Sequence, residues 1–174
     1  ELLRKKGQAS AAKKAGRIAA EGCVKIAASA DGKTVAILEL NCETDFVAKD
    51  ENFLKFSESA AQLALAEQPT SLEALMAASL PEGESLENAR NTLIAKIGEN
   101  IAVRRMEIVQ AQGQIAQYIH GSRIGAVVDL VGGDAALARD IAMHVAAAAP
   151  ACVSEAEVPA DQLANEKRIL SEQA

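Results

Sequence analysis

Residues 34–67 read TVAILELNCETDFVAKDENFLKFSESAAQLALAE, and this stretch decides the fold. Residues 34–41 alternate between apolar and more polar side chains, which is typical of a half-buried β-strand. After a short loop, apolar residues recur at helical spacing: Phe53, Phe56, Ala60, Leu63 and Ala64. The stretch therefore predicts a strand that leads into an amphipathic helix through the loop at residues 42–50.

The residues before this stretch complete a β-hairpin. Residues 24–28 alternate in the same way, and Asp31-Gly32 supplies a tight turn between the two strands. Further upstream, residues 8–20 (QASAAKKAGRIAA) are rich in Ala and Lys, which favour a helix, and we expect this helix to end at Gly22.

Two more helices are predicted after Pro69, which stops the amphipathic helix. Thr70 and Glu73 have the spacing of a capping box for a short helix. Residues 85–97 then place apolar side chains on one helical face, and Gly98 ends this helix.

From residue 100 onward the apolar period returns to two. Strands are predicted at residues 100–108, 115–119 and 124–131, with a turn at HGSR around Gly121. Asp134 then caps a helix that ends at Pro150. The predicted apolar face of that helix carries Leu137, Ile141, Val145 and Ala148, with His144 buried or half-buried beside them.

Residues 24–69 and 115–150 share one plan of strand, tight turn, strand, polar cap, Ala-rich helix and proline. This repeat predicts an α+β fold of two similar subdomains, each an antiparallel sheet with helices packed on one face, preceded by an N-terminal helix. We place the N-terminal helix and linker at residues 1–21, the first subdomain at 22–113, and the second, truncated at its C-terminus, at 114–174.

Composition narrows the classes of function. The chain has 174 residues and a formal net charge of −6, and no apolar run approaches the roughly 20 residues of a membrane-spanning helix. Nucleic acid is also disfavoured as a partner, because phosphate binding takes clustered Lys and Arg. The three cysteines are widely separated, which fits a reducing compartment better than a disulfide framework.

The sequence carries no motif of a catalytic or nucleotide-binding site. It lacks a GxxxxGKS or GxxxxGKT loop, a GxGxxG turn after a strand, HExxH and CxxC, so we expect no bound cofactor, metal or nucleotide. Cys42 with a histidine is a candidate thiol nucleophile, but nothing near it in the sequence would lower the thiol pKa. We therefore expect a protein that is not an enzyme.

Two exposed positions could contact another protein. The loop NCETDFVAK at residues 41–49 places Phe46 and Val47 where polar turn residues are expected. Phe46 either folds back as a core lid or hydrophobic staple or projects toward a partner, and the pattern leaves both open. His120 lies at the predicted hairpin tip beside Gly121, where partner contact and simple solvation are both compatible with the sequence.

Several segments resemble the elongation factor Ts family. ELNCETDFVAK at residues 39–49 is similar to the signature of the family, and four further segments are similar in the same order along the chain. They are AAKKAGRIAAEG (11–22), KIGENIAVRR (96–105), HGSRIG (120–125) and IAMHVAA (141–147). The resemblance covers nearly the whole chain and implies two related α+β subdomains and guanine nucleotide exchange on the GTPase elongation factor Tu.

The resemblance also implies which residues contact the partner. The segment that disturbs the Mg²⁺ site of the GTPase corresponds to Thr44, Asp45, Phe46 and Val47. Further partner-contacting positions correspond to Ile97, Gly98 and His120. The second subdomain is implied to lean on another domain of elongation factor Tu, the assembly could be a dimer of heterodimers, and the location is implied to be cytoplasmic, with a bacterium favoured over an organelle.

The chain also departs from the family pattern. It begins without a Met, residues 1–7 resemble only the end of an N-terminal three-helix module, and family members continue past residue 174. LPEGESLEN at residues 80–88 resembles a local insertion away from the site. The alternative function is therefore a protein-binding scaffold of the same fold without exchange activity, because missing segments would supply needed contacts.

Overall fold

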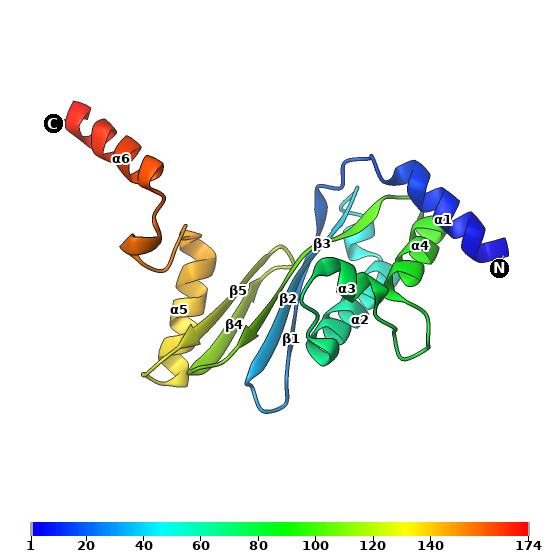
Figure 1. The fold of residues 1–174 in the computed structure, drawn as a ribbon, viewed down its shortest axis with the longest axis horizontal. Coiled ribbons are helices and arrows are strands. Elements are labelled where there is room, and N and C mark those ends of the chain that lie inside the picture. Colours follow the sequence, from blue (N-terminus) through cyan, green and yellow to red (C-terminus); the bar gives the residue numbers. More distant parts are fainter. Residues whose placement is uncertain (1, 174) are drawn as a thin grey trace.

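The structure is a computed structural model that describes residues 2–173 of the chain. Two antiparallel sheets lie side by side along the long axis of the molecule, and helices cover the outer face of each (Figure 1). The layers follow the order α5, then β4 and β5, then β1 to β3, then α2 and α4. The predicted α+β fold with two small antiparallel sheets is confirmed.

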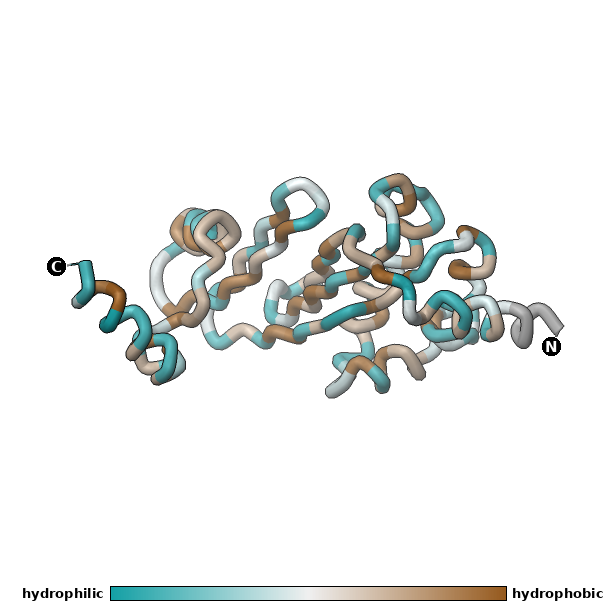
Figure 2. Tube along the Cα trace, turned by 90° about the horizontal axis from the view of Figure 1, so that it is seen from above, coloured by the Kyte–Doolittle hydropathy of each residue, from teal (hydrophilic) through white to brown (hydrophobic). Residues whose placement is uncertain are grey.

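The first sheet has the strand order β1-β2-β3. Its strands are β1 (Glu21–Ala28), β2 (Thr34–Cys42) and β3 (Ile101–Gln110), and both pairings are antiparallel. Ala36, Leu38, Leu40 and Cys42 alternate along β2 and are almost completely buried, whereas Ile37 and Glu39 between them are half-buried and line the side toward the second sheet. Figure 2 shows the apolar residues concentrated along these central strands.

Four helices belong to the first sheet. They are α1 (Leu2–Lys14), α2 (Glu51–Glu67), α3 (Leu72–Ala77) and α4 (Leu86–Ile97). α2 packs on β1 and β2, and α1 packs on α4. The largest fully buried side chains of the core come from these helices and from the sheet: Phe53, Leu38, Leu40, Leu75, Leu86, Ile94 and Ile101.

The second sheet consists of β4 (Gln114–His120) and β5 (Ile124–Leu130). Helix α5 (Ala135–Ala148) covers its outer face, with Asp134 capping the helix as predicted. A short 3-10 turn at Glu155–Glu157 then leads to α6 (Ala160–Gln173), which extends away from the rest of the molecule (Figure 1).

Three local predictions are wrong. α1 ends at Lys14, so residues 15–20 are not helical, because the chain there turns toward the start of β1. Ser71, not Thr70, caps α3 through a hydrogen bond that its hydroxyl accepts from the Ala74 N–H.

The packed face of α5 also differs from the prediction. The fully buried residues are the small Ala138 and Ala142, whereas Leu137 is 46% exposed and His144 is exposed. Small side chains let α5 approach the sheet closely, so the contact face centres on Ala138 and Ala142, with Ile141 and Val145 half-buried beside them.

Candidate functional site

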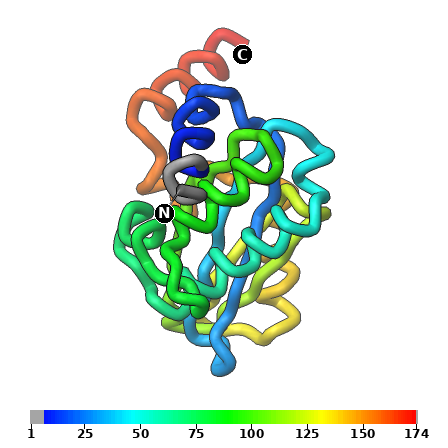
Figure 3. The backbone as a smooth tube through the Cα atoms, turned by 90° about the vertical axis from the view of Figure 1, so that its right-hand side faces the viewer, coloured from blue at the N-terminus to red at the C-terminus, as the bar shows by residue number. Residues whose placement is uncertain are grey.

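Three connecting segments meet at one end of the first sheet. The strand register pairs Glu21, the first residue of β1, with Cys42, the last residue of β2, and pairs Cys42 with Ile101, the first residue of β3. The segments that flank these residues are therefore neighbours in space: residues 15–20, 43–50 and 98–100. We call this region the loop end, and Figure 3 shows the segment after α1 and the loop after β2 together at the same end of the molecule.

Glu99 holds the loop that follows β2. Its carboxylate accepts hydrogen bonds from the Thr44 hydroxyl at 2.7 Å, the Thr44 N–H at 3.0 Å and the Glu43 N–H at 3.1 Å. Hydrogen bonds to a carboxylate are stronger than those between neutral groups. The turn after α4 therefore fixes the loop, although the two segments are more than fifty residues apart in the sequence.

Glu43 ties the third segment into the same network. Its carboxylate accepts a hydrogen bond from the Asn100 N–H at 2.5 Å and forms an ion pair with Arg17 at 2.9 Å. The Asn100 side-chain amide donates to the Arg17 carbonyl oxygen at 2.8 Å. Because the Glu43 side chain is only 14% exposed, this ion pair is better shielded from solvent than a pair on the open surface.

The loop divides its two apolar residues between solvent and core. Phe46 is 82% exposed, whereas Val47 is 8% exposed and belongs to the core cluster. Val47 also begins a 3-10 turn, Val47–Lys49, which leads to the cap of α2. The Phe46 ring is therefore neither a core lid nor a hydrophobic staple, because either arrangement would bury it.

The remaining residues that the sequence singled out in this loop divide in the same way. Asp45 is exposed and pairs with Lys49 at 3.0 Å, while Thr44 is half-buried and bonded to Glu99. Asp45 and Phe46 thus face solvent, and Thr44 and Val47 hold the loop from inside.

Ile97 and Gly98 lie where α4 ends and the Glu99 turn begins. Ile97 is half-buried and packs against the core. Gly98 has a φ of 90° and its N–H donates to the Ile94 carbonyl oxygen at 2.9 Å. A φ in this range favours glycine, so Gly98 is suited to the reversal that brings Glu99 under the loop.

His120 is exposed at the end of β4, as predicted. Its Nδ1 lies 3.3 Å from the Tyr118 hydroxyl oxygen. The turn that follows it is docked on β1, because the Val24 N–H donates to the Ser122 carbonyl oxygen at 2.7 Å and Arg123 pairs with Glu21 at 3.0 Å. Since Glu21 begins β1, this turn lies near the loop end.

Cys42 is not placed to act as a nucleophile. The side chain is fully buried, and burial together with the nearby Glu99 carboxylate raises its pKa to about 12. Its thiol donates to the Thr44 carbonyl oxygen at 3.3 Å. The thiolate that nucleophilic chemistry needs is therefore disfavoured at neutral pH.

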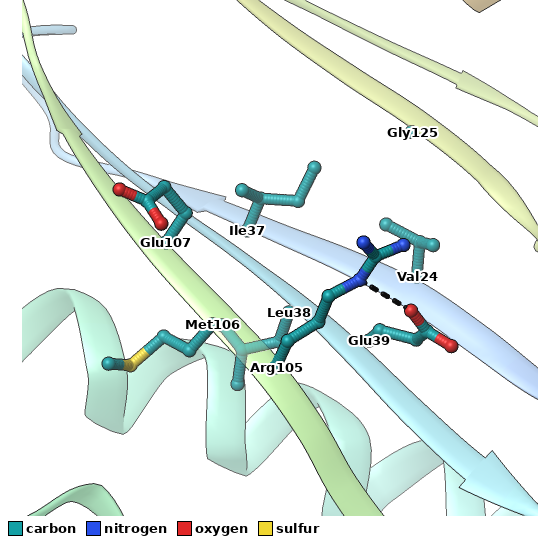
Figure 4. Close-up of a pocket in the computed structure, with 8 residues that line it drawn as sticks. All are labelled: Val24, Ile37, Leu38, Glu39, Arg105, Met106, Glu107 and Gly125. Atoms are coloured by element: carbon teal, nitrogen blue, oxygen red, sulfur yellow. Dashed lines mark hydrogen bonds and ion pairs between the residues drawn. The ribbon is translucent and has the colours of Figure 1, made fainter. Parts of the chain in front are cut away.

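A cleft of about 350 Å³ opens between the two sheets (Figure 4). Its lining includes the ion pair of Arg105 with Glu39 at 2.6 Å, beside Val24, Ile37 and Gly125. Among residues 2–173, no group of three or more potential metal ligands comes together, and no helix is long and apolar enough to cross a membrane.

The family model described as Elongation factor TS matches residues 43–174, which include the loop, the Glu99 turn and His120. The chain belongs to the elongation factor Ts family. It is 53% identical over 175 residues to elongation factor Ts of Methylococcus capsulatus, covering 100% of this chain and 60% of that protein.

Two further elongation factor Ts proteins are similar to the same extent. The protein of Alkalilimnicola ehrlichii is 56% identical over 175 residues, which cover 100% of this chain and 60% of the relative. The protein of Arthrospira platensis is 53% identical over 171 residues, which cover 98% of this chain and 69% of the relative. The chain thus spans about 60% of the length of the first two relatives.

The network behind the elongation factor Ts loop could not be found from local sequence signals. Glu99, Asn100 and Arg17 lie far from residue 43 in the sequence, and each is of a type common on protein surfaces. Only their place at the ends of paired strands brings them together.

Proposed function

We propose that the chain is a guanine nucleotide exchange factor for elongation factor Tu, and that its loop end docks on the GTPase. The observation that carries this proposal is the exposed ring of Phe46 on a loop that Glu99 and Val47 hold from inside. A preordered loop can insert an apolar ring at little entropic cost.

The physical basis of such an activity is linkage. A protein that binds the nucleotide-free GTPase more tightly than the loaded form must weaken nucleotide binding by the same factor. We propose that Asp45 and Phe46 disturb the Mg²⁺ and phosphate site of the partner, while Thr44, Val47, Ile97 and Gly98 position them. No acid, base or metal on this chain is needed, so we propose that it is not an enzyme.

The alternative is a scaffold of the same fold that binds without promoting exchange. Release of fluorescent GDP from elongation factor Tu separates the two functions, because an exchange factor acts at substoichiometric concentration. We expect this chain to accelerate release when it is about tenfold less abundant than the GTPase. Binding without acceleration would favour the scaffold.

Phe46→Ala tests the role of the ring. Burying a Phe side chain in a partner contributes about 1.5–3 kcal/mol, so we expect GDP release to slow about tenfold or more. The melting temperature should change little, because the ring is 82% exposed in the free chain.

Val131→Ala is a matched control, because Val131 is 77% exposed and lies beyond β5, outside the loop end. Release that remains at the wild-type rate for Phe46→Ala would contradict the proposed role of the ring.

A further inference from the structure

Ile18 is the most exposed large apolar residue at the loop end. It is 86% exposed, compared with 82% for Phe46, and it lies in the non-helical segment between α1 and β1. A single exposed aliphatic side chain is common on protein surfaces. The distinctive feature of Ile18 is how firmly the backbone beside it is held.

Three contacts fix the neighbouring residue Arg17. Its carbonyl oxygen accepts a hydrogen bond from the Asn100 side chain at 2.8 Å, and its guanidinium group pairs with Glu43 at 2.9 Å. The Arg17 N–H also donates to the Lys14 carbonyl oxygen at 2.9 Å, which joins the segment to the end of α1. Ile18 therefore projects from a backbone that is tied at its preceding residue.

The same network holds Phe46. Glu43 binds Arg17 on one side, and its own N–H is bound by the Glu99 carboxylate, which also holds Thr44 two residues before Phe46. One set of hydrogen bonds and ion pairs thus fixes the chain beside both exposed apolar side chains. Ordering an apolar side chain before binding lowers the entropic cost of burying it in a partner.

We propose that Ile18 is a second apolar contact with the GTPase, presented together with Phe46 on one rigid surface. This inference rests on the proposed function, and it extends the docking surface from the loop after β2 to the segment before β1. The expected occupant is an apolar depression on the GTPase that adjoins the position of Phe46, because the segments that carry both residues, the one before β1 and the one after β2, lie at the same end of the first sheet.

The test compares Ile18→Ser, Ile18→Leu and the wild-type chain in two assays: release of fluorescent GDP from elongation factor Tu and affinity for the nucleotide-free GTPase. Loss of one aliphatic contact predicts about tenfold weaker affinity for Ile18→Ser and correspondingly slower release. Ile18→Leu keeps an aliphatic side chain and should stay close to wild type. All three proteins should share one melting temperature, since Ile18 contributes little to the core.

Val153→Ser is the matched control, because Val153 is 95% exposed and lies between α5 and α6, away from the loop end. An active wild-type chain combined with unchanged binding and release by Ile18→Ser would overturn the inference alone. So would an equal loss in Val153→Ser, because the effect would then not belong to the loop end. A wild-type chain that leaves GDP release unchanged would overturn the proposed function and this inference together.

Discussion

Glu99 is the residue on which the geometry of the loop end depends most. It accepts three hydrogen bonds from two consecutive loop residues, and both of its carboxylate oxygens are used. An amide in its place keeps one acceptor oxygen but offers an NH₂ group to donors that need an acceptor. Losing part of this set would leave the Asp45 and Phe46 side chains on a mobile loop.

Glu99→Gln should therefore reduce exchange without unfolding the chain. Hydrogen bonds to a charged group contribute about 1.5–3 kcal/mol, so we expect a fall in stability of that order and a several-fold slower GDP release per folded molecule. Glu107→Gln is the control, since Glu107 is exposed on β3. Wild-type release by Glu99→Gln at a clearly lowered melting temperature would show that the hydrogen bonds of Glu99 stabilise the fold but do not contribute to exchange.

At this scale the sequence predicted candidates but not their environment. The unusual pair Phe46-Val47 was visible in a polar loop, yet the pattern left open whether Phe46 folds back onto the core or faces solvent. The structure separates them because Val47 starts a turn that reaches the core. His144 shows the reverse, since its helical position next to apolar residues predicted a buried or half-buried side chain, whereas the residue is exposed.

At the scale of elements, α2 is the helix in which the apolar periodicity of the sequence and the N-terminal cap both agree with the observed structure. Asp50 caps it by accepting hydrogen bonds from the N–H groups of Asn52 at 2.8 Å and Phe53 at 3.3 Å. The amphipathic helix predicted after the loop at residues 42–50 is observed at Glu51–Glu67. The end of α1 was missed because Ala and Lys favour helix through residue 20, whereas Asn100 and Glu43 capture Arg17 by tertiary contacts.

The cap on α2 should make the stability of the protein depend on pH. The hydrogen bond from the Asn52 side chain, followed by those from the backbone, lowers the pKa of Asp50 from its ordinary value of 3.8. Protonation is thus easier in the unfolded chain. The stabilising effect is fully present above the ordinary pKa and is lost as the pH falls through the lowered one.

Asp50→Asn removes this titration while keeping an acceptor oxygen at the cap. Between about pH 5 and pH 3, the urea midpoint of the variant should fall less steeply than that of the wild-type chain. Parallel curves for the two proteins would show that other carboxylates account for the acid sensitivity. Comparing the variant with wild type at each pH cancels the contribution of those other groups.

At the scale of the whole molecule, the arrangement depends on how the second sheet meets the first. The repeat of strand, turn, strand and helix predicted two similar subdomains, and two small sheets with helices are observed. Their mutual packing was not predictable, because it depends on a close approach between residues a hundred positions apart. Gly125 of β5 lies against β1 so closely that an added Cβ atom would be 2.6 Å from Val24 Cγ1.

The glycine is required there for space and not for backbone conformation, because its φ lies outside the left-handed range whereas an added Cβ would meet Val24 Cγ1. Gly125→Ala should therefore push the sheets apart at a cost of about 1–3 kcal/mol, the usual range for overpacking. The turn between β4 and β5 precedes Gly125 and contacts β1 through Ser122 and Arg123. The substitution should therefore weaken these contacts too, and His120 should be held less firmly relative to the loop end.

The steric cause makes a second-site prediction possible. Val24→Ala removes the obstructing Cγ1 atom and leaves Ile37 Cδ1 at 3.3 Å, a distance that a flexible side chain can relieve. The double variant Gly125→Ala with Val24→Ala should thus recover most of the stability that Gly125→Ala loses. Hydrogen exchange of β4, β5 and α5, measured beside that of α2, would locate the effect at the junction. If the losses in the free energy of unfolding from the two single substitutions simply add in the double variant, the close contact is contradicted. Residues in direct contact couple by about 0.5–3 kcal/mol.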